Sequence, residues 1–384
     1  MKPTIFEINT FDTTYAAYIR SRKMRDLLVN EGYRVIYSEA NYQVENDSSR
    51  LRRNGTRTIN TKNYPFAVLN ITQSDGMVSF ALATVKRLFY VSTLKYEILF
   101  LHQLSILTAP LILAAKIKGK KIVLDWDDLA SAVQSSPWRS LLGRLAENPF
   151  VVRQTDLILS HNSLIIAEAK KMTKSPVEYI TQGINTEHFN IKKYQKQSMV
   201  LKNKLNIVGK NVLIYAVSFN TGGVADLDII LAAMKIVVRE NPNILLIILG
   251  GGPLLGKYQI KESPNIQFLG QVDHDKVPEY LSLADYGLVF MRDSTGNRMK
   301  MSLKTLEYLS MPIPVIGHLV GGTQKAVEKY IIESSSTSIS LAKTIVQTIK
   351  KQIKKRPDSR KYIIDNFGVE VMEKQFLKAL GKLT

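Results

Sequence analysis

The feature that most limits how this chain can fold is an alternation of short apolar runs with longer amphipathic stretches from one end to the other. Ile5 to Ile8 predicts a strand, Tyr15 to Glu31 a helix that stops at Gly32, and Arg34 to Tyr37 the next strand. Strands separated by helices predict an α/β fold, in which a parallel sheet carries helices on both faces. Further strands of this series are expected at 67–71, 97–101, 121–124, 156–160 and 177–180.

The alternation restarts near residue 211, after a polar, lysine-rich stretch between Thr186 and Gly209. With 384 residues, the chain is about the right length for two domains of ordinary size. We expect a Rossmann-like domain at 1–190, a second at 191–360, and at 361–384 a final helix, broken at Gly368, that packs back toward the first domain. The second series of strands is expected at 212–216, 244–249, 266–269, 286–290 and 313–316.

Composition removes several kinds of chemistry. The chain has no cysteine, which excludes disulfides, thiolate metal sites and cysteine nucleophiles. Its five histidines show no metal-ligand spacing, so a structural zinc site is not expected. We also expect no cofactor. The N-terminus has no signal-peptide pattern, and Ile98 to Ile117 reads as a strand and a short helix rather than a membrane span. These features favour a cytoplasmic protein.

The formal net charge is +19, which favours an anionic partner if it is more than an ordinary basic surface. No nucleic-acid-binding signature is visible, so nucleic acid is not expected as a partner. A basic, amphipathic stretch from Phe80 to Tyr90 could lie on the inner face of an anionic membrane, or could be a core helix with basic flanks. A basic segment precedes that stretch, formed by Arg50, Arg52, Arg53, Arg57 and Lys62.

Ligands of such sheets bind at the carboxyl ends of the strands, where helix N-termini hold phosphates. Three segments there are candidates. Gly250, Gly251 and Gly252 follow one strand, and the loop from Ser218 to Gly223, with Asn220, follows another; each could approach a diphosphate or be a plain turn.

The third segment is a polar loop that carries Arg292, Arg298 and Lys300 and opens a helix at about Ser302, a good N-cap residue. Glu307 lies inside this helix beside a buried strand, where a carboxylate needs a partner. This partner could be the diol of a bound ribose. Alternatively, it could be Lys304, three residues earlier on the same helix.

Several motifs of the chain resemble those of a known family, the retaining GT-B glycosyltransferases of the "glycosyl transferases group 1", or family 4, type. The resemblance covers essentially the whole chain, through blocks that occur in the family's order. These blocks are 155–163, 182–189, 247–253, 266–272, 277–285 and 302–316, the last of which resembles the signature P-x-K-x-x-E.

The resemblance implies two Rossmann-like domains facing each other across a cleft. The nucleotide-sugar donor would be held mostly by the C-terminal domain, and the acceptor that receives the sugar mostly by the N-terminal domain. Glu307 would hold the ribose hydroxyls, and Lys304 would help to neutralise the phosphates. The N–H groups around Met301, Ser302 and Leu303 would bind the diphosphate. The reaction would be retaining, need no metal, and pass a sugar to a lipid- or glycan-linked acceptor.

The chain also departs from the family pattern. The second glutamate that many members carry is Met299 here, and the basic pair expected in the Ser218 to Gly223 loop is missing, so Arg298 or Lys300 would have to supply the charge. The family's histidine after the strand at 121–124 is Asp127, which could orient an acceptor hydroxyl or cap the next helix. These departures keep a second hypothesis open, a non-catalytic GT-B subunit that supports a partner glycosyltransferase.

Overall fold

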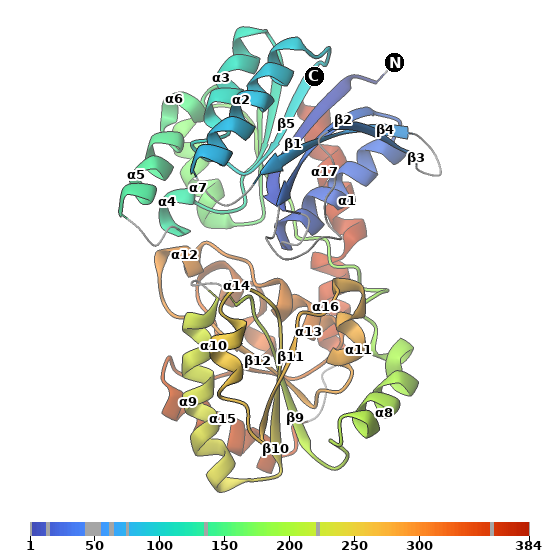
Figure 1. The fold of residues 1–384 in the computed structure, drawn as a ribbon, viewed down its shortest axis with the longest axis vertical. Helices are drawn as coiled ribbons and strands as arrows, with labels where there is room; N and C mark the ends of the chain where they lie inside the picture. Colours follow the sequence, from blue (N-terminus) through green and yellow to red (C-terminus); the bar gives the residue numbers. More distant parts are fainter. Residues whose placement is uncertain are drawn as a thin grey trace. The chain divides into compact units, whose positions relative to one another are not determined.

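The computed structural model describes residues 2–12, 16–42, 55–60, 65–73, 77–133, 137–219, 223–353 and 357–383. The chain divides into two compact units, which Figure 1 shows as ribbons. The first contains Met1–Gly183 and, from the other end of the chain, Met372–Thr384, and the second is Ile184–Val371. The first unit thus ends a few residues before the boundary expected at 190.

The first unit is built on an eight-stranded sheet with the order β3-β4-β2-β1-β5-β6-β7-β8. Neighbouring strands of this sheet run parallel, except β3 and β4, which pair antiparallel. The strands are β1 (Thr4–Asp12), β2 (Arg34–Tyr42), β3 (Gly55–Asn60), β4 (Pro65–Gln73), β5 (Ile98–His102), β6 (Lys121–Asp125), β7 (Leu157–Ser160) and β8 (Val177–Tyr179).

Strand β3 is a correction, because the sequence around Arg57 was read only as a basic segment. Thr56, Thr58 and Ile59 are β-branched and suit an edge strand, and its partner β4 supplies the register. The other basic positions of that segment, Arg50, Arg52, Arg53 and Lys62, lie outside the described residues.

Helices cover both faces of this sheet, as the alternation predicts. Figure 1 shows α2 and α3 on one side of it and α1 and α17 on the other. The helices of the unit are α1 (Ala16–Asn30), α2 (Met77–Thr93), α3 (Ala109–Ile117), α4 (Ala130–Val133), α5 (Pro137–Ala146), α6 (Pro149–Val152), α7 (Ser163–Met172) and α17 (Val369–Leu380), followed by η5 (Gly381–Leu383).

The second unit has a six-stranded parallel sheet with the order β11-β10-β9-β12-β13-β14. Its central strands are apolar on both faces: in β10, Leu245, Ile247 and Leu249 face one core cluster, and the alternate residues face the other. The strands are β9 (Asn211–Ala216), β10 (Ile244–Leu249), β11 (Ile266–Gly270), β12 (Tyr286–Phe290), β13 (Val315–His318) and β14 (Ile331–Glu333), the last of which was not foreseen.

The helices of this unit divide between the two core clusters. Helices α9 and α15 pack on one face, and α11, α13 and α16 contribute to the other. The helices are η2 (Ile191–Tyr194), α8 (Gln195–Lys204), α9 (Val224–Glu240), α10 (Leu255–Gln259), η3 (His274–Lys276), α11 (Val277–Leu281), α12 (Thr295–Arg298), α13 (Leu303–Ser310), α14 (Gly321–Val327), η4 (Glu328–Tyr330), α15 (Ser338–Lys350) and α16 (Pro357–Phe367).

The end of the chain forms two helices, α16 and α17, that meet at Gly368, so the predicted break is confirmed. The ring of Phe376 in α17 stacks on Phe100 of β5, with 5.7 Å between the ring centroids. Gly183 has a φ of +70°, and a Cβ there would lie 2.6 Å from Sδ of Met372. Only glycine therefore lets the end of the first unit's sheet approach the returning helix.

Among the parallel strands, the strand order reverses direction once in each sheet, between β1 and β5 in the first and between β9 and β12 in the second. Such a switch point opens a crevice at the carboxyl ends of the strands, where α/β proteins bind ligands. Within the described residues, no helix is long and apolar enough to cross a membrane.

Candidate functional site

Helix α13 lies beside the switch point of the second unit and is held there by a close approach to the sheet. The phenol oxygen of Tyr308 accepts a hydrogen bond from the backbone N–H of Ala216 at the end of β9, at 2.9 Å. A Cβ on Gly287 of β12 would lie 2.5 Å from the Tyr308 ring. The absence of a side chain at Gly287 therefore lets the helix settle against β12.

The C-terminal end of α13 is fixed by hydrogen bonds to two other segments of the unit. The Ser310 hydroxyl donates to the Phe189 carbonyl at 3.0 Å, and the Ser359 hydroxyl donates to the Leu309 carbonyl at 2.9 Å. Arg360 of α16 adds bonds to the carbonyls of Phe189 and Ser310. A helix fixed in this way holds the residues of its first turn in defined positions.

The N-terminal end of α13 begins where the sequence predicts, with Ser302 at the N-cap position. The Ser302 side chain makes no capping hydrogen bond, because its hydroxyl oxygen accepts from Thr305 Oγ1 at 2.7 Å. The Ser302 N–H donates to Thr323 Oγ1 at 2.9 Å, which pins the loop. The N–H groups of the first helical turn have no intrahelical acceptor, so this end can receive an anion.

Lys304 places its ammonium group between the helix and the end of β9. Its Nζ donates to the Ala216 carbonyl at 2.8 Å and lies 4.0 Å from the centroid of the Tyr215 ring. Burial lowers the pKa of Lys304 to about 8; the charge of Asp226 opposes this fall and that of Lys300 adds to it. An anion bound nearby would stabilise the charged form.

Glu307 is buried, one turn further along α13, and it pairs with His274 rather than with Lys304. The distance between Glu307 Oε1 and His274 Nε2 is 3.0 Å. His274 opens η3 just after β11, and its side chain is 39% exposed, so one edge of the pair reaches solvent. The alternative in which Lys304 is the partner of Glu307 is therefore wrong.

The other predicted donor-site residues of the second unit take different positions. Met301 and Leu303 are half-buried and pack against the core, and Lys300 is half-buried with its carbonyl bound by Thr323 Oγ1 at 2.9 Å. Arg298 is exposed and forms a two-pronged ion pair with Asp293, at 2.5 and 2.6 Å. Asn220 lies outside the described residues.

The glycines after β10 serve the packing of two loops. The carbonyl of Gly251 accepts from the N–H of Phe219 at 2.9 Å, and a Cβ on Gly250 would lie 1.7 Å from the Val217 carbonyl oxygen. A Cβ on Gly252 would also crowd the Phe219 carbonyl. The close approach that these glycines permit is thus between the loops after β9 and β10 themselves.

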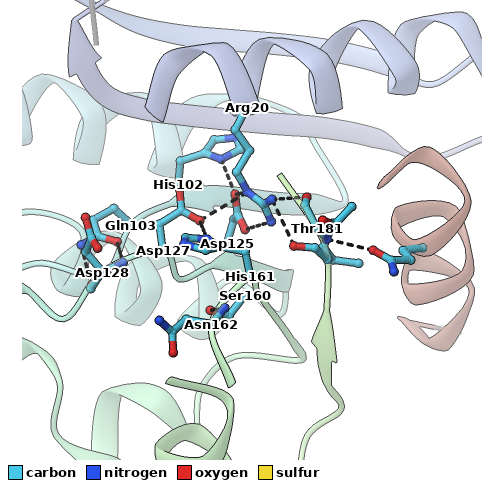
Figure 2. Close-up of polar contacts among 12 residues, drawn as sticks. Arg20, His102, Gln103, Asp125, Asp127, Asp128, Ser160, His161, Asn162 and Thr181 are labelled. Carbon is cyan, nitrogen blue, oxygen red and sulfur yellow. Dashed lines mark hydrogen bonds and ion pairs between the residues drawn. The ribbon is translucent and has the colours of Figure 1, made fainter. Parts of the chain in front are cut away.

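The first unit holds a buried network of charged side chains at its own switch point, shown in part in Figure 2. Glu7 of β1 and His102 of β5 meet across the two strands, with 2.8 Å between Glu7 Oε1 and His102 Nε2. His102 Nδ1 lies 3.3 Å from Asp125 at the end of β6. Burial alone would lower the pKa of His102, but hydrogen bonds to Asp125 and Glu7 and their charges raise it to about 9.

Arg20 of α1 is the centre of this network and is almost completely buried (Figure 2). Its guanidinium grips Asp125 through two hydrogen bonds of 3.0 Å and donates to the carbonyls of Ile180 and Thr181. Burial would raise the pKa of Asp125, but the Arg20 charge and the hydrogen bonds from His102 and Arg20 hold it well below its usual range. Asp125 is therefore a permanent carboxylate.

Asp127 lies at the rim of the network, with 18% of its side chain exposed. Its Oδ1 is 3.3 Å from Arg20 Nε and 3.1 Å from Nδ1 of His161, which follows β7. Arg20 and His161 are the partners found for its side chain within the described residues, rather than the N-terminus of the next helix. Asp127 is thus the member of the network that can still reach a ligand.

Five residues of these polar contacts were not among the site residues predicted from the sequence: Glu7, Arg20, His102, His161 and His274. A signal for three of them was present: Glu7 interrupts an apolar strand, and His102 and His161 directly follow the strands expected at 97–101 and 156–160. Arg20 and His274 carried no comparable signal, because their partners are far away in sequence. No group of three or more histidine, aspartate or glutamate side chains among the described residues could hold a metal ion.

Comparison with known proteins shows which family model, relatives and solved structures the chain resembles. Residues 210–351 match the model of the family described as "Glycosyl transferases group 1". The chain is 24% identical over 233 residues to a Bacillus subtilis protein named as the teichuronic acid biosynthesis glycosyltransferase TuaH. It is 25% identical over 220 residues to chitobiosyldiphosphodolichol beta-mannosyltransferase of Candida albicans.

These alignments use 58% and 51% of this chain and span 56% and 46% of the two relatives, about half of each. Among solved structures, HepE of Anabaena in complex with UDP and glucose has a TM-score of 0.70 at 13% identity, over 99% of both chains. An alpha,alpha-trehalose 6-phosphate synthase of Burkholderia multivorans has a TM-score of 0.71 at 11% identity, over 100% of this chain and 99% of the other. The fold is therefore GT-B, and residues 210–351 match the model of a group 1 glycosyl transferase domain.

Proposed function

We propose that this chain, with its group 1 domain at residues 210–351, is a retaining glycosyltransferase that takes a sugar from a nucleoside-diphosphate donor. The observation that carries the proposal is the first part of α13. Within two turns it combines an open helix N-terminus, the enclosed ammonium of Lys304 and the partly accessible carboxylate of Glu307. These groups match the diphosphate and the ribose of one ligand.

The donor would be held by charge at one end and by hydroxyl contacts at the other. The first-turn N–H groups after Ser302 bind the diphosphate, and Lys304 adds a positive charge. Lys300 and Arg298 are further sources of positive charge at the same loop. Glu307 accepts hydrogen bonds from the ribose hydroxyls, while His274 holds its carboxylate in place.

The main catalytic task of this arrangement is to stabilise the negative charge that develops on the leaving nucleoside diphosphate. No acid or base is required beside the departing phosphate if the acceptor attacks on the face from which the diphosphate leaves. Retention of configuration is supported by the resemblance of 302–316 to the retaining signature. Proton NMR of the first product reads the anomeric outcome directly.

The acceptor is a hydroxyl of a lipid- or glycan-linked molecule, and Asp127 is the group that would orient it. Support comes from the exposed rim of Asp127 and from the Candida relative, whose name gives a sugar carried on dolichol diphosphate. We place the enzyme in the cytoplasm, in peripheral contact with the inner face of the cell membrane. Asp127→Asn is expected to slow transfer and leave hydrolysis of the donor in place.

The decisive variant is Glu307→Ala, with Glu328→Ala as a control on an exposed carboxylate of the same unit. Losing hydrogen bonds to a charged group costs about 1.5–3 kcal/mol, so donor affinity should fall roughly 10- to 100-fold. Thermal shift against a panel of nucleotide sugars identifies the donor, since a ligand of the native state raises its stability. Isothermal titration then measures each variant.

Wild-type affinity in Glu307→Ala would remove this residue from the donor site. A folded wild-type chain that neither binds nor turns over any nucleotide sugar would overturn the enzyme proposal. That result would favour the hypothesis of a non-catalytic subunit, which is supported by Met299 and by the missing basic pair in the Ser218 to Gly223 loop.

A further inference from the structure

Helix α2 carries a row of large apolar side chains that face solvent. Val78 is 76% exposed, Leu82 60%, Val85 61% and Phe89 63%. Residues on a soluble helix are rarely so apolar on the outside, and contiguous apolar patches of this kind mark interaction surfaces. We call these four side chains the α2 apolar stripe.

The four positions form one continuous face of the helix. They follow spacings of four, three and four residues, which at 100° per residue keeps them within an arc of about 60°. The opposite face is buried, with Ala83, Thr84, Arg87 and Val91 against the unit. The stripe therefore points away from the core that the helix itself helps to form.

The charged residues of α2 itself are all positive. Helix α2 contains no acidic residue; Lys86 is exposed beside the stripe, whereas Arg87 is buried. At its C-terminal end, Lys118 donates to the carbonyls of Ser92 and Val91. Lys118 follows Ile117, which is itself 87% exposed at the end of the neighbouring helix α3. Apolar side chains with a basic margin match the interface of an anionic bilayer.

We propose that the α2 apolar stripe docks this protein on an anionic lipid bilayer, with α2 lying in the plane of the interface. The apolar side chains enter the acyl boundary, and Lys86 and Lys118 face the lipid phosphates. Docking itself is independent of catalysis. The docking proposal rests on the proposed function only in the role that it gives to docking, which is to bring the enzyme to a lipid-linked acceptor.

A second copy of this chain is the competing occupant, because a spacing of four, three and four also fits a short coiled-coil seam. Charge favours the bilayer. The α2 of a second copy offers no carboxylate to pair with Lys86, since the helix has none. Anionic lipid supplies that missing charge.

The test is co-sedimentation of the full chain with vesicles, either of pure phosphatidylcholine or with about a third phosphatidylglycerol. The double variant Leu82→Ser, Phe89→Ser removes half of the stripe without changing charge. The matched control is Met199→Ser, Val200→Ser on α8, whose side chains are 71% and 66% exposed. Lys86→Gln tests the basic margin.

We expect wild type and the α8 control to bind the anionic vesicles, more weakly as salt rises. The stripe variant should lose at least about tenfold in partitioning, because two large side chains no longer leave water. Lys86→Gln should lose less, about two- to fivefold.

Three results would overturn the proposal: no binding to anionic vesicles, equal binding by wild type and the stripe variant, or self-association in ultracentrifugation that the stripe variant abolishes. Donor-induced thermal shift of the stripe variant keeps the two proposals apart. A chain that docks on vesicles but binds no nucleotide sugar would leave docking in place and refute the glycosyltransferase.

Discussion

The two units place polar groups at equivalent points of their sheets but use them differently. At the switch point of the first unit, Glu7, His102, Asp125 and Arg20 pair with one another in a buried network. At the switch point of the second, the start of α13 has no side-chain cap, and the Glu307 and His274 pair is partly accessible. One centre is closed by its own charges, and the other is open to a ligand.

This difference shows that net charge alone does not distinguish the proposed donor site from the closed network of the first unit. The first unit carries 27 lysines and arginines against 17 aspartates and glutamates, and the second carries 25 against 16, so the excess is nearly equal. What differs is whether each charge has a fixed partner. A buried cation whose carboxylates surround it contributes to the fold, whereas uncapped N–H groups remain able to bind an anion.

The largest expected effect on stability follows from removing the buried cation of the first unit's network. Arg20→Met removes the guanidinium that pairs with Asp125 and Asp127 and should reduce the free energy of unfolding by about 3–5 kcal/mol. Urea denaturation measures the loss. The control is Arg22→Met on the same helix, whose side chain is 63% exposed and whose pair with Asp26 should contribute less than about 1 kcal/mol. Equal losses in both variants would contradict a central role for Arg20.

The pH dependence of stability separates the two centres further. The pKa of His102 is raised from 6.5 to about 9, so between these values the folded chain holds a proton that the unfolded chain has lost. The stability from this group is complete below about pH 6.5 and is lost as pH rises toward 9, by up to about 3 kcal/mol.

His102→Gln should abolish this part of the pH profile, measured by urea denaturation between about pH 6 and 9.5. It should also be less stable than wild type at the low end, where the charged histidine contributes most. A variant that keeps the wild-type profile would show that the titrating group lies elsewhere.

At the start of α13 we expect the smallest effect on stability, together with a clear effect on donor affinity. Lys304→Met removes a buried cation with a lowered pKa, so thermal stability should stay the same or rise slightly. Donor affinity should fall about 10- to 100-fold, because a charge-assisted contact to the diphosphate is lost. Lys325→Met, at an exposed position of α14, is the control.

The wild type adds a pH test of the same contact. Lys304 loses its proton above about pH 8, so donor affinity should weaken as pH rises through that value, and Lys304→Met should show no such trend. Isothermal titration at about pH 7 and 9 measures both. A fall in stability without a change in affinity would make Lys304 a structural residue.

Much of the fold could be predicted from local pattern. The strands from Ile5 to Ile316 occur near their expected places because a buried parallel strand must be apolar on both faces, which the sequence displays. The break at Gly368 and the start of α13 at Ser302 were visible for the same local reason. Strand β3 was not, because its few alternating residues become a strand only through their pairing with β4.

The sequence by itself determined the periodic pattern of strands and helices, the absence of cysteine chemistry and the position of the α13 segment in an ordered set of motifs. Only the tertiary structure decided which charges meet. Glu7 and His102 are 95 residues apart and pair because β1 lies beside β5. Arg20 of α1 and Asp125 at the end of β6 are 105 residues apart and meet at the same switch point. The exposure of the α2 stripe was decided in the same way, because packing against the rest of the unit determines which face of the helix is buried and which faces solvent. Local periodicity follows from backbone geometry, but the pairing of distant side chains depends on strand order, which no local pattern specifies.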